Sequence, residues 1–228
     1  MRLFVATWPP PPVVAALAEL EHPDVGTVRW TDPSRWHVTL VFLGNPAPVG
    51  PSDDATPADA TTDAAAATTT TTDPAAAVEA VVEEAVVEET IARLRRVPVA
   101  AHAHTVARLG AVTGSFGRSV LYVPVLGLDA LAGAVRTAHA AGAAGSDGPD
   151  PVPFNGHLTL GRARRRRDDV RPLAGMSVGR AAGMEWTVDE LALVASVSRG
   201  GKGRYETLST VSVPGGDYPT SNMRSGLQ

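Results

Sequence analysis

The chain has 228 residues, of which 44% are hydrophobic and 19% charged, so we expect a packed core in one large domain or two small lobes. It contains no cysteine, which excludes disulfides, thiolate metal sites and cysteine nucleophiles. Its formal net charge of −4 is unlike that of a general nucleic-acid binder, whose affinity comes largely from Lys and Arg contacts to phosphates, so any contact with RNA must be local. The apolar run at the start is too short for a signal peptide, and no later run approaches the ~18 apolar residues of a membrane span. We therefore expect a cytoplasmic protein with no membrane partner.

The first half of the chain predicts strands and one short helix, followed by a low-complexity segment. Strands are predicted over residues 3–7, 28–30 and 36–43, and a helix over residues 13–20, just after a run of four prolines. Residues 46–72 are rich in Ala, Thr, Pro and Asp and contain almost nothing large enough to bury. Because such a segment cannot offset the entropy of ordering, we expect a disordered surface insertion there.

The second half predicts two helices and a series of strands. The helices span residues 75–96 and 128–140, and the strands span residues 97–107, 119–125, 152–161, 186–197 and 204–213. Since most strands follow one another through short turns, the order favours an α+β fold with antiparallel sheets over a doubly wound parallel sheet. We predict one bilobal domain over residues 1–213, interrupted by the insertion at 46–72, and a mobile tail over residues 214–228.

A four-residue pattern of His, an apolar residue, Thr and Leu occurs twice, beginning at His37 and at His157. Both copies fall on predicted strands, one in each half of the chain. Side chains alternate between the faces of a strand, so each histidine shares a face with its own threonine, Thr39 or Thr159, while the apolar residues between them point to the core. A lone histidine in a strand is usually structural, but the repeat of the whole pattern indicates a functional pair.

Two such half-sites facing each other would place two imidazoles and two hydroxyls around one central group. Histidine is the side chain whose ordinary pKa lets one copy be neutral and another protonated near pH 7, as general base and general acid catalysis require. A phosphate ester fits: one imidazole deprotonates the attacking water or hydroxyl, the other protonates the leaving oxygen, and Thr39 and Thr159 hold the non-bridging oxygens. The sequence therefore predicts catalysis on a phosphate ester with neither a metal nor another cofactor, and either histidine can be the acid.

Several further segments carry a resemblance to known proteins. They are residues 2–6, 37–44, 153–154, 161–162 and 198–205. Together with the two motifs, they resemble the 2H phosphoesterase superfamily, and within it the RNA 2′,3′-cyclic phosphodiesterases, also called 2′-5′ RNA ligase-like proteins. The resemblance implies a bilobal fold of two antiparallel sheets with outer helices and pseudo-two-fold symmetry, in which the two motifs face each other across a central cleft.

The resemblance also implies an activity and a set of site residues. The family hydrolyses a terminal 2′,3′-cyclic phosphate on RNA to a 2′-phosphate, and some members also join or cleave 2′-5′ linkages in tRNA halves. By position, the catalytic histidines match His37 and His157, the phosphate-binding hydroxyls match Thr39 and Thr159, and the arginine that commonly follows the second motif matches Arg162. Where many relatives carry Arg-Pro before the second motif, this chain has Asn155-Gly156. The expected partners are RNA with a 2′,3′-cyclic phosphate end, such as tRNA fragments, or cyclic nucleotides, bound by a monomer.

Two groups of residues carry weaker signals. The run at residues 162–167 contains five arginines and fits either an RNA-backbone contact or a solvated loop. Arg162 is the member with the stronger claim, because the strand fixes its distance from His157. Phe42 and Tyr205 fit stacking on a base of single-stranded RNA, although core packing explains Phe42 equally well.

Other interpretations compete with catalysis by the two motifs. His102 and His104 would share one face of a strand and could begin a metal site, but the sequence offers no obvious third ligand nearby. A second hypothesis for the function is a nucleotide- or RNA-binding module that has lost turnover. A third is an interaction protein that uses the insertion at 46–72 as a tether.

Overall fold

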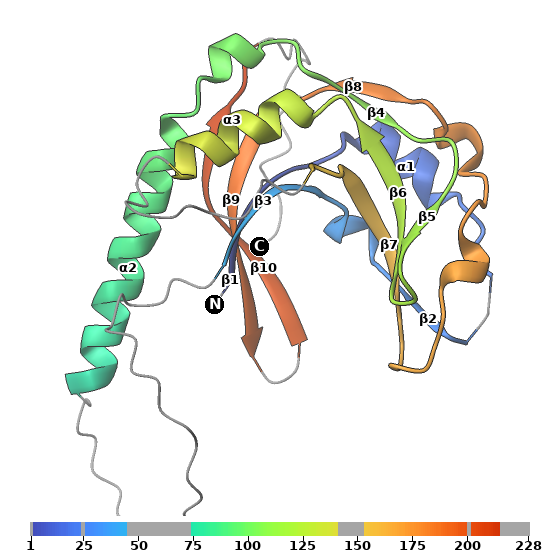
Figure 1. Cartoon of the computed structure of the whole chain (residues 1–228), viewed down its shortest axis with the longest axis horizontal. Helices are drawn as coiled ribbons and strands as arrows, with labels where there is room; N and C mark the ends of the chain where they lie inside the picture. The colour runs from blue at the N-terminus through green and yellow to red at the C-terminus, as the bar shows by residue number, and fades with distance from the viewer. Residues whose placement is uncertain (1, 24–25, 45–73, 141–152, 200–201, 215–228) are drawn as a thin grey trace, which may run out of the picture.

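The computed structural model of the chain describes residues 2–23, 26–44, 74–140, 153–199 and 202–214. Within these residues, ten strands form one curled antiparallel sheet (Figure 1). The strands are β1 (Arg2–Thr7), β2 (Val28–Trp30), β3 (Val38–Gly44), β4 (Val106–Leu109), β5 (Gly114–Phe116), β6 (Val120–Leu126), β7 (His157–Ala163), β8 (Glu185–Thr187), β9 (Glu190–Arg199) and β10 (Lys202–Ser212). Their order is β10-β9-β1-β3-β7-β6-β4-β8, with β2 paired to β7 and β5 paired to β6.

The sheet is continuous, whereas the sequence predicts two sheets. β3 and β7 meet through one backbone pair, Val38 with Leu158, and this junction divides the order of the described strands into two groups of four. The prediction of two sheets is wrong because the two strands that follow the motif histidines pair with each other instead of belonging to separate sheets. The antiparallel arrangement is confirmed, and symmetry between the two halves stays a prediction.

Helices lie outside the sheet. In the described part of the chain they are α1 (Pro11–Ala18), α2 (Pro74–Arg95) and α3 (Asp129–Ala140), with 3₁₀ helices η1 (Pro33–Arg35), η2 (Val99–His102), η3 (Arg171–Leu173) and η4 (Gly179–Ala181). α1 begins with prolines, whose missing N–H costs no hydrogen bond in a first turn. α3 carries Asp129 in its first turn, where the helix dipole favours a negative charge, and buries Leu131 and Val135 on one face. None of these helices has the length and apolar character needed to cross a membrane.

The main core lies between one face of the sheet and the helices. Val5, Val38 and Leu158 from the central strands are fully buried in one cluster with Leu17 of α1 and Val135 of α3. Burying each such side chain stabilises the fold by ~1.5–3 kcal/mol. This cluster fixes which residues of β3 and β7 point inward, and therefore which point to the opposite face.

The opposite face of the sheet carries a smaller apolar cluster. It consists of Phe4, Ala6, Ala192 and Val194, with Trp8 and Tyr205 packed against it. Thr39 pairs with Ala6 across β1 and β3, so it belongs to this second face. The helices do not contribute to this cluster, which leaves the face available for a site.

One predicted strand, over residues 97–107, is wrong. These residues instead form η2 before β4 begins at Val106. Pro98 cannot donate a hydrogen bond to a ladder, and His104 has a left-handed backbone with φ 60°, which no strand accommodates. His102 and His104 therefore do not share a strand face.

Two other boundaries differ from the prediction. β7 begins at His157 rather than at residue 152, and the single strand predicted over 186–197 is divided into β8 and β9. β5 is not predicted, because three residues are too few to show an alternation. The remaining predicted helices and strands are confirmed within a few residues. The predicted insertion at 46–72 and the predicted tail beyond Pro214 lie outside the described residues.

Candidate active site

The two motifs meet at the centre of the sheet. The backbone pairs Val38 of the first motif with Leu158 of the second, and both of these side chains are fully buried. In this antiparallel register, each motif histidine lies opposite the threonine of the other motif. All four polar side chains point away from the core, because they alternate with buried residues along the chain.

The two imidazoles are held by the same backbone contact. His37 Nδ1 lies 2.8 Å from the carbonyl oxygen of Arg35, and His157 Nδ1 lies 2.8 Å from that of Asn155. A carbonyl oxygen can only accept, so each Nδ1 carries the hydrogen and donates it. The Nε2 atom of each ring is then free to accept a proton from a substrate or, once protonated, to donate one.

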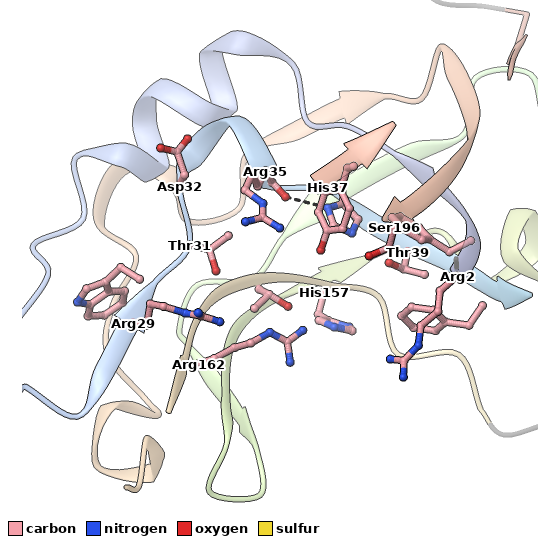
Figure 2. A pocket seen from close by; sticks show the side chains of 15 residues that line it. Arg2, Arg29, Thr31, Asp32, Arg35, His37, Thr39, His157, Arg162 and Ser196 are labelled. Atoms are coloured by element: carbon pink, nitrogen blue, oxygen red, sulfur yellow. Dashed lines mark hydrogen bonds between the residues drawn. The ribbon is translucent and has the colours of Figure 1, made fainter. Parts of the chain in front are cut away.

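Both motifs open into one cavity of about 710 Å³, a volume in the range of small-molecule sites (Figure 2). All five residues predicted for the site line it: His37, Thr39, His157, Thr159 and Arg162. The other lining residues are Arg2, Phe4, Arg29, Trp30, Thr31, Asp32, Arg35, Phe42, Ser196 and Tyr205. The cavity therefore draws side chains from both halves of the sheet.

The lining of the cavity is strongly cationic. It includes four arginines, Arg2, Arg29, Arg35 and Arg162, and none of them forms an ion pair within the residues that the structure describes. The single lining carboxylate, Asp32, accepts hydrogen bonds from the backbone N–H of Ser34 at 2.9 Å and from its hydroxyl at 2.6 Å. These bonds cap η1 and lower the pKa of Asp32. The excess of positive charge suits an anionic ligand such as a phosphate ester.

Burial lowers the pKa of both motif histidines, although the hydrogen bond at each Nδ1 acts in the opposite direction. The two rings differ in their charged neighbours. Positive charge on Arg35 and Arg162 lowers the pKa of His37 further, whereas at His157 only Arg162 among the arginines has this effect.

Aromatic rings contact both histidines. Phe4 stacks on His37 at 5.2 Å between centroids, and Tyr205 forms a T-shaped contact with it at the same separation. Phe116 and Tyr122, from β5 and β6, contact His157 at 4.8 and 5.5 Å. These rings restrict the imidazoles to one orientation and lower the local polarity.

Known structures share this architecture, whereas no family model and no curated protein sequence matches the chain. TT0787 of Thermus thermophilus is 25% identical, with a TM-score of 0.59 over 95% of this chain and 100% of that one. LigT of E. coli, in complex with 3′-AMP, is 19% identical, with a TM-score of 0.54 over 93% of this chain and 96% of that one. A protein described as a phosphoesterase is 19% identical, with a TM-score of 0.55 over 93% and 98%.

The chain has the 2H phosphoesterase fold. The comparisons cover nearly all of the chain and of each similar structure, so the likeness extends over the whole fold. The resemblance of the two motifs to that superfamily predicts this fold, and in it the two motifs line one cavity at the junction of β3 and β7.

The structure separates the other predicted candidates. Of the arginine run, Arg162 lines the cavity, while Arg165, Arg166 and Arg167 line a separate shallow hollow. Arg164 donates a hydrogen bond from Nε to the carbonyl oxygen of Val28 at 3.1 Å. The run is therefore divided between the site and a loop outside it.

The aromatic and metal-ligand candidates are also resolved. Phe42 exposes 75% of its surface, so the interpretation as core packing is wrong. Tyr205 lines the cavity, with the guanidinium carbon of Arg35 4.7 Å from its ring centre. His102 and His104 lie outside the cavity. No group of three His, Asp or Glu side chains suited to a metal ion occurs among the residues described.

The sequence does not predict several residues of the cavity, among them Arg2, Arg29 and Arg35. Arg35 has a signal, since it lies two residues before His37 with the buried Trp36 between them. Arg2 has no such signal, because it precedes the first predicted strand by one residue, although it begins β1 in the structure. Arg29 has none, because its place depends on the pairing of β2 with β7, two segments far apart in the chain.

Proposed function

We propose that the chain is a 2H phosphodiesterase that hydrolyses the 2′,3′-cyclic phosphate at the end of an RNA to a 2′-phosphate. The observation that carries this proposal is a pair of imidazoles, each anchored through Nδ1 to a backbone carbonyl 2.8 Å away, that opens on one cavity lined by four arginines. Such a pair can supply both a base and an acid, and the arginines favour an anionic substrate.

In the proposed reaction, the Nε2 of one imidazole takes a proton from water while the water oxygen forms a bond to phosphorus. The bond between phosphorus and O3′ breaks, and O3′ takes a proton from the Nε2 of the other, protonated imidazole. The product keeps the phosphate on O2′ and regains a 3′-hydroxyl. The hydroxyls of Thr39 and Thr159 donate to the non-bridging oxygens, and Arg162 offsets the negative charge of the phosphate.

In this proposal His37 is the base and His157 is the acid. A general base must be neutral before the reaction, and a general acid must be protonated. The positive charge of Arg35 acts against protonation of His37 alone, whereas that of Arg162 acts against protonation of both rings. The reactive form therefore has one proton shared by the pair, located on His157.

The similar structures support a nucleotide substrate. LigT of E. coli has been solved in complex with 3′-AMP, ATP, NADP+ and phosphate, and it shares the fold of this chain. We propose that the substrate is a single-stranded RNA end, tRNA fragments included, or a cyclic nucleotide. The proposed form is a monomer in the cytoplasm that uses no metal.

Product analysis tests this function directly. An oligoribonucleotide ending in a 2′,3′-cyclic phosphate is incubated with the protein in EDTA, and ³¹P NMR distinguishes a 2′- from a 3′-monophosphate. We expect the 2′-monophosphate alone, and far slower formation of it by His37→Ala or His157→Ala. A 3′-monophosphate would contradict the assigned leaving group. Binding without hydrolysis would favour the alternative of a nucleotide- or RNA-binding module, and joining of tRNA halves would identify a 2′-5′ RNA ligase.

A further inference from the structure

Two arginines lie directly opposite each other on neighbouring strands at one end of the cavity. β2 pairs with β7 so that Arg29 is the partner of Arg162. Like charges at directly opposed positions of an antiparallel pair destabilise a sheet. The guanidinium group of neither arginine forms a hydrogen bond or an ion pair among the residues that the structure describes, and Asp32, the only carboxylate of the lining, accepts hydrogen bonds from Ser34.

The close approach of the two strands keeps this pair together. The N–H of Thr31 donates to the carbonyl oxygen of Leu160 at 2.7 Å. A Cβ added at Gly161 would come within 2.7 Å of Val28 Cγ1 and 3.3 Å of the Arg29 carbonyl oxygen, so only glycine lets β2 lie this close to β7. The arrangement therefore holds two positive charges side by side with no anion of the described chain between them.

The pair lies beyond the centre where the histidines meet. Arg162 is three residues past Thr159 on β7, which corresponds to about 10 Å along a strand. Figure 2 shows the guanidinium groups of Arg29 and Arg162 in the same part of the cavity, on the side away from Arg2. The charge of Arg162 contributes to the lowered pKa of both motif histidines, whereas that of Arg29 contributes to neither. Arg29 is thus placed for a group farther from the reacting phosphorus.

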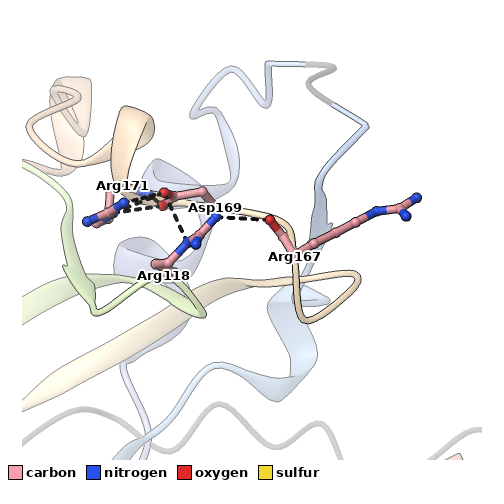
Figure 3. Close-up of polar contacts among 4 residues, drawn as sticks. All are labelled: Arg118, Arg167, Asp169 and Arg171. Atoms are coloured by element: carbon pink, nitrogen blue, oxygen red, sulfur yellow. Dashed lines mark hydrogen bonds and ion pairs between the residues drawn. The ribbon is translucent and has the colours of Figure 1, made fainter.

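The loop that carries Arg165, Arg166 and Arg167 does not offer a comparable phosphate site in the cavity. Arg118 and Arg171 both contact Asp169, and hydrogen bonds from Arg171 hold the pKa of Asp169 at about 2 (Figure 3). Arg118 also donates to the carbonyl oxygen of Arg167 at 3.0 Å, so the backbone of this loop is tied down while the side chain of Arg167 points away from the network. The exposed arginines of this loop line a hollow that is separate from the cavity.

We propose that Arg29, together with Arg162, binds a second phosphate of the substrate, the one on O5′ of the nucleotide that carries the cyclic phosphate. This inference rests on the proposed function, because it takes the histidine pair as the place of the cyclic phosphate. Arginine presents paired N–H donors that match the spacing of phosphate oxygens. Two guanidinium groups opposite each other can therefore bind the same phosphate from both sides. The same group is a phosphodiester in an RNA strand and a phosphomonoester in a 5′-phosphorylated mononucleotide. The enzyme is therefore selective for substrates with a phosphate on O5′ over a nucleoside 2′,3′-cyclic phosphate without one.

Three substrates test this selectivity: a nucleoside 2′,3′-cyclic phosphate with a free 5′-hydroxyl, the same molecule with a 5′-phosphate, and a dinucleotide ending in the cyclic phosphate. We expect wild-type kcat/KM to be roughly 10- to 100-fold higher for the two that carry the second phosphate, as for a hydrogen bond to a charged group. Arg29→Gln should lose this advantage, so that its kcat/KM becomes nearly equal for the three substrates. Arg29→Lys, which keeps the charge without the fork, should retain part of it, and Arg166→Gln, from the loop outside the cavity, should retain all of it.

The outcomes separate this inference from the proposed function. If the wild-type protein hydrolyses all three substrates without preference, or if Arg29→Gln keeps the full preference, the second-phosphate site is wrong and the hydrolase stands. If Arg29→Gln still prefers the dinucleotide, the higher kcat/KM comes from contacts with the second nucleoside, and the second-phosphate site is again wrong. If the wild-type protein hydrolyses none of the three, the proposed function itself fails. Circular dichroism of each variant confirms that a lost preference does not come from unfolding.

Discussion

The two halves of the cavity hold their histidines in the same way but surround them differently. In each half, Nδ1 donates to the carbonyl oxygen two residues earlier in the chain. Rings from β1 and β10 pack around His37, whereas rings from β5 and β6 contact His157. Arg35 acts on the pKa of His37 alone. A repeated motif thus determines where an imidazole lies, while its neighbours give each ring a different aromatic and charged environment.

The halves also differ five residues after each histidine. Phe42 stands at that position in one half with 75% of its surface exposed, and Arg162 stands there in the other. Both side chains line the cavity. At this position, one half therefore offers an apolar ring to a ligand, and the other offers a positive charge.

Removing either imidazole should have the largest effect on activity. We expect His37→Ala and His157→Ala each to lower kcat on a 2′,3′-cyclic nucleotide by ~10²–10⁴, the usual contribution of a general acid or base. Because the two rings act as a unit, the double variant should lose little more than either single one. His102→Ala, outside the cavity, is the matched control and should keep the wild-type kcat in the same steady-state assay. Full activity in either motif variant would contradict the paired mechanism.

The threonines offer a second comparison between the halves. Thr39→Ala and Thr159→Ala should each lower kcat/KM by roughly 10- to 100-fold, because a hydrogen bond to a charged group contributes about 1.5–3 kcal/mol. Replacement by serine keeps the hydroxyl and should restore most of the rate. If the alanine and serine variants lose activity equally, the hydroxyl is not the group that matters.

Substitution of Phe42 tests whether its exposed ring stacks on the base of the substrate. Stacking of a base on an aromatic side chain contributes about 1–3 kcal/mol, so Phe42→Ala should raise KM for a cyclic nucleotide by roughly 5-fold or more. Phe42→Tyr keeps the ring and should stay near the wild-type value. An abasic ribose 2′,3′-cyclic phosphate should show the same KM with all three proteins, and a matching rise there would argue against base stacking.

The smallest expected effect is a shift in the pH profile. The positive charge of Arg35 contributes to the lowered pKa of His37, so Arg35→Gln should raise that pKa. A base must be neutral, and the acid limb of kcat/KM against pH reports its pKa, so this limb should move to higher pH. Arg166→Gln, which removes an arginine outside the cavity, should leave the profile in place. Movement of the basic limb to higher pH in place of the acid limb would reverse the assignment of roles.

The sequence predicts the parts of the site that depend on local alternation. His37 and Thr39 share a face because buried Val38 lies between them, and the same holds for the second motif. The junction of the two motifs depends instead on the single pair of Val38 with Leu158, and the position of Arg29 depends on its pairing with β7. Such long-range pairing leaves no signal in either segment alone.

Local backbone irregularities are also missed by the sequence-based prediction of strands. The strand predicted over residues 97–107 reads as β in composition, but Pro98 and the left-handed backbone of His104 end it. A lowered pKa would not have identified the site either, since burial also lowers the pKa of His139, which lies in α3 outside the cavity. What identifies the site is the shared cavity together with the matched contacts of the two rings.

The most direct test of the paired mechanism is the pH dependence of kcat/KM on a 2′,3′-cyclic nucleotide for the wild-type protein and for the two motif variants. A bell-shaped wild-type profile is predicted, in which His37→Ala removes the acid limb and His157→Ala removes the basic limb from the residual activity. A profile with a single limb in the wild-type protein, or both limbs intact in the variants, would contradict catalysis by this pair.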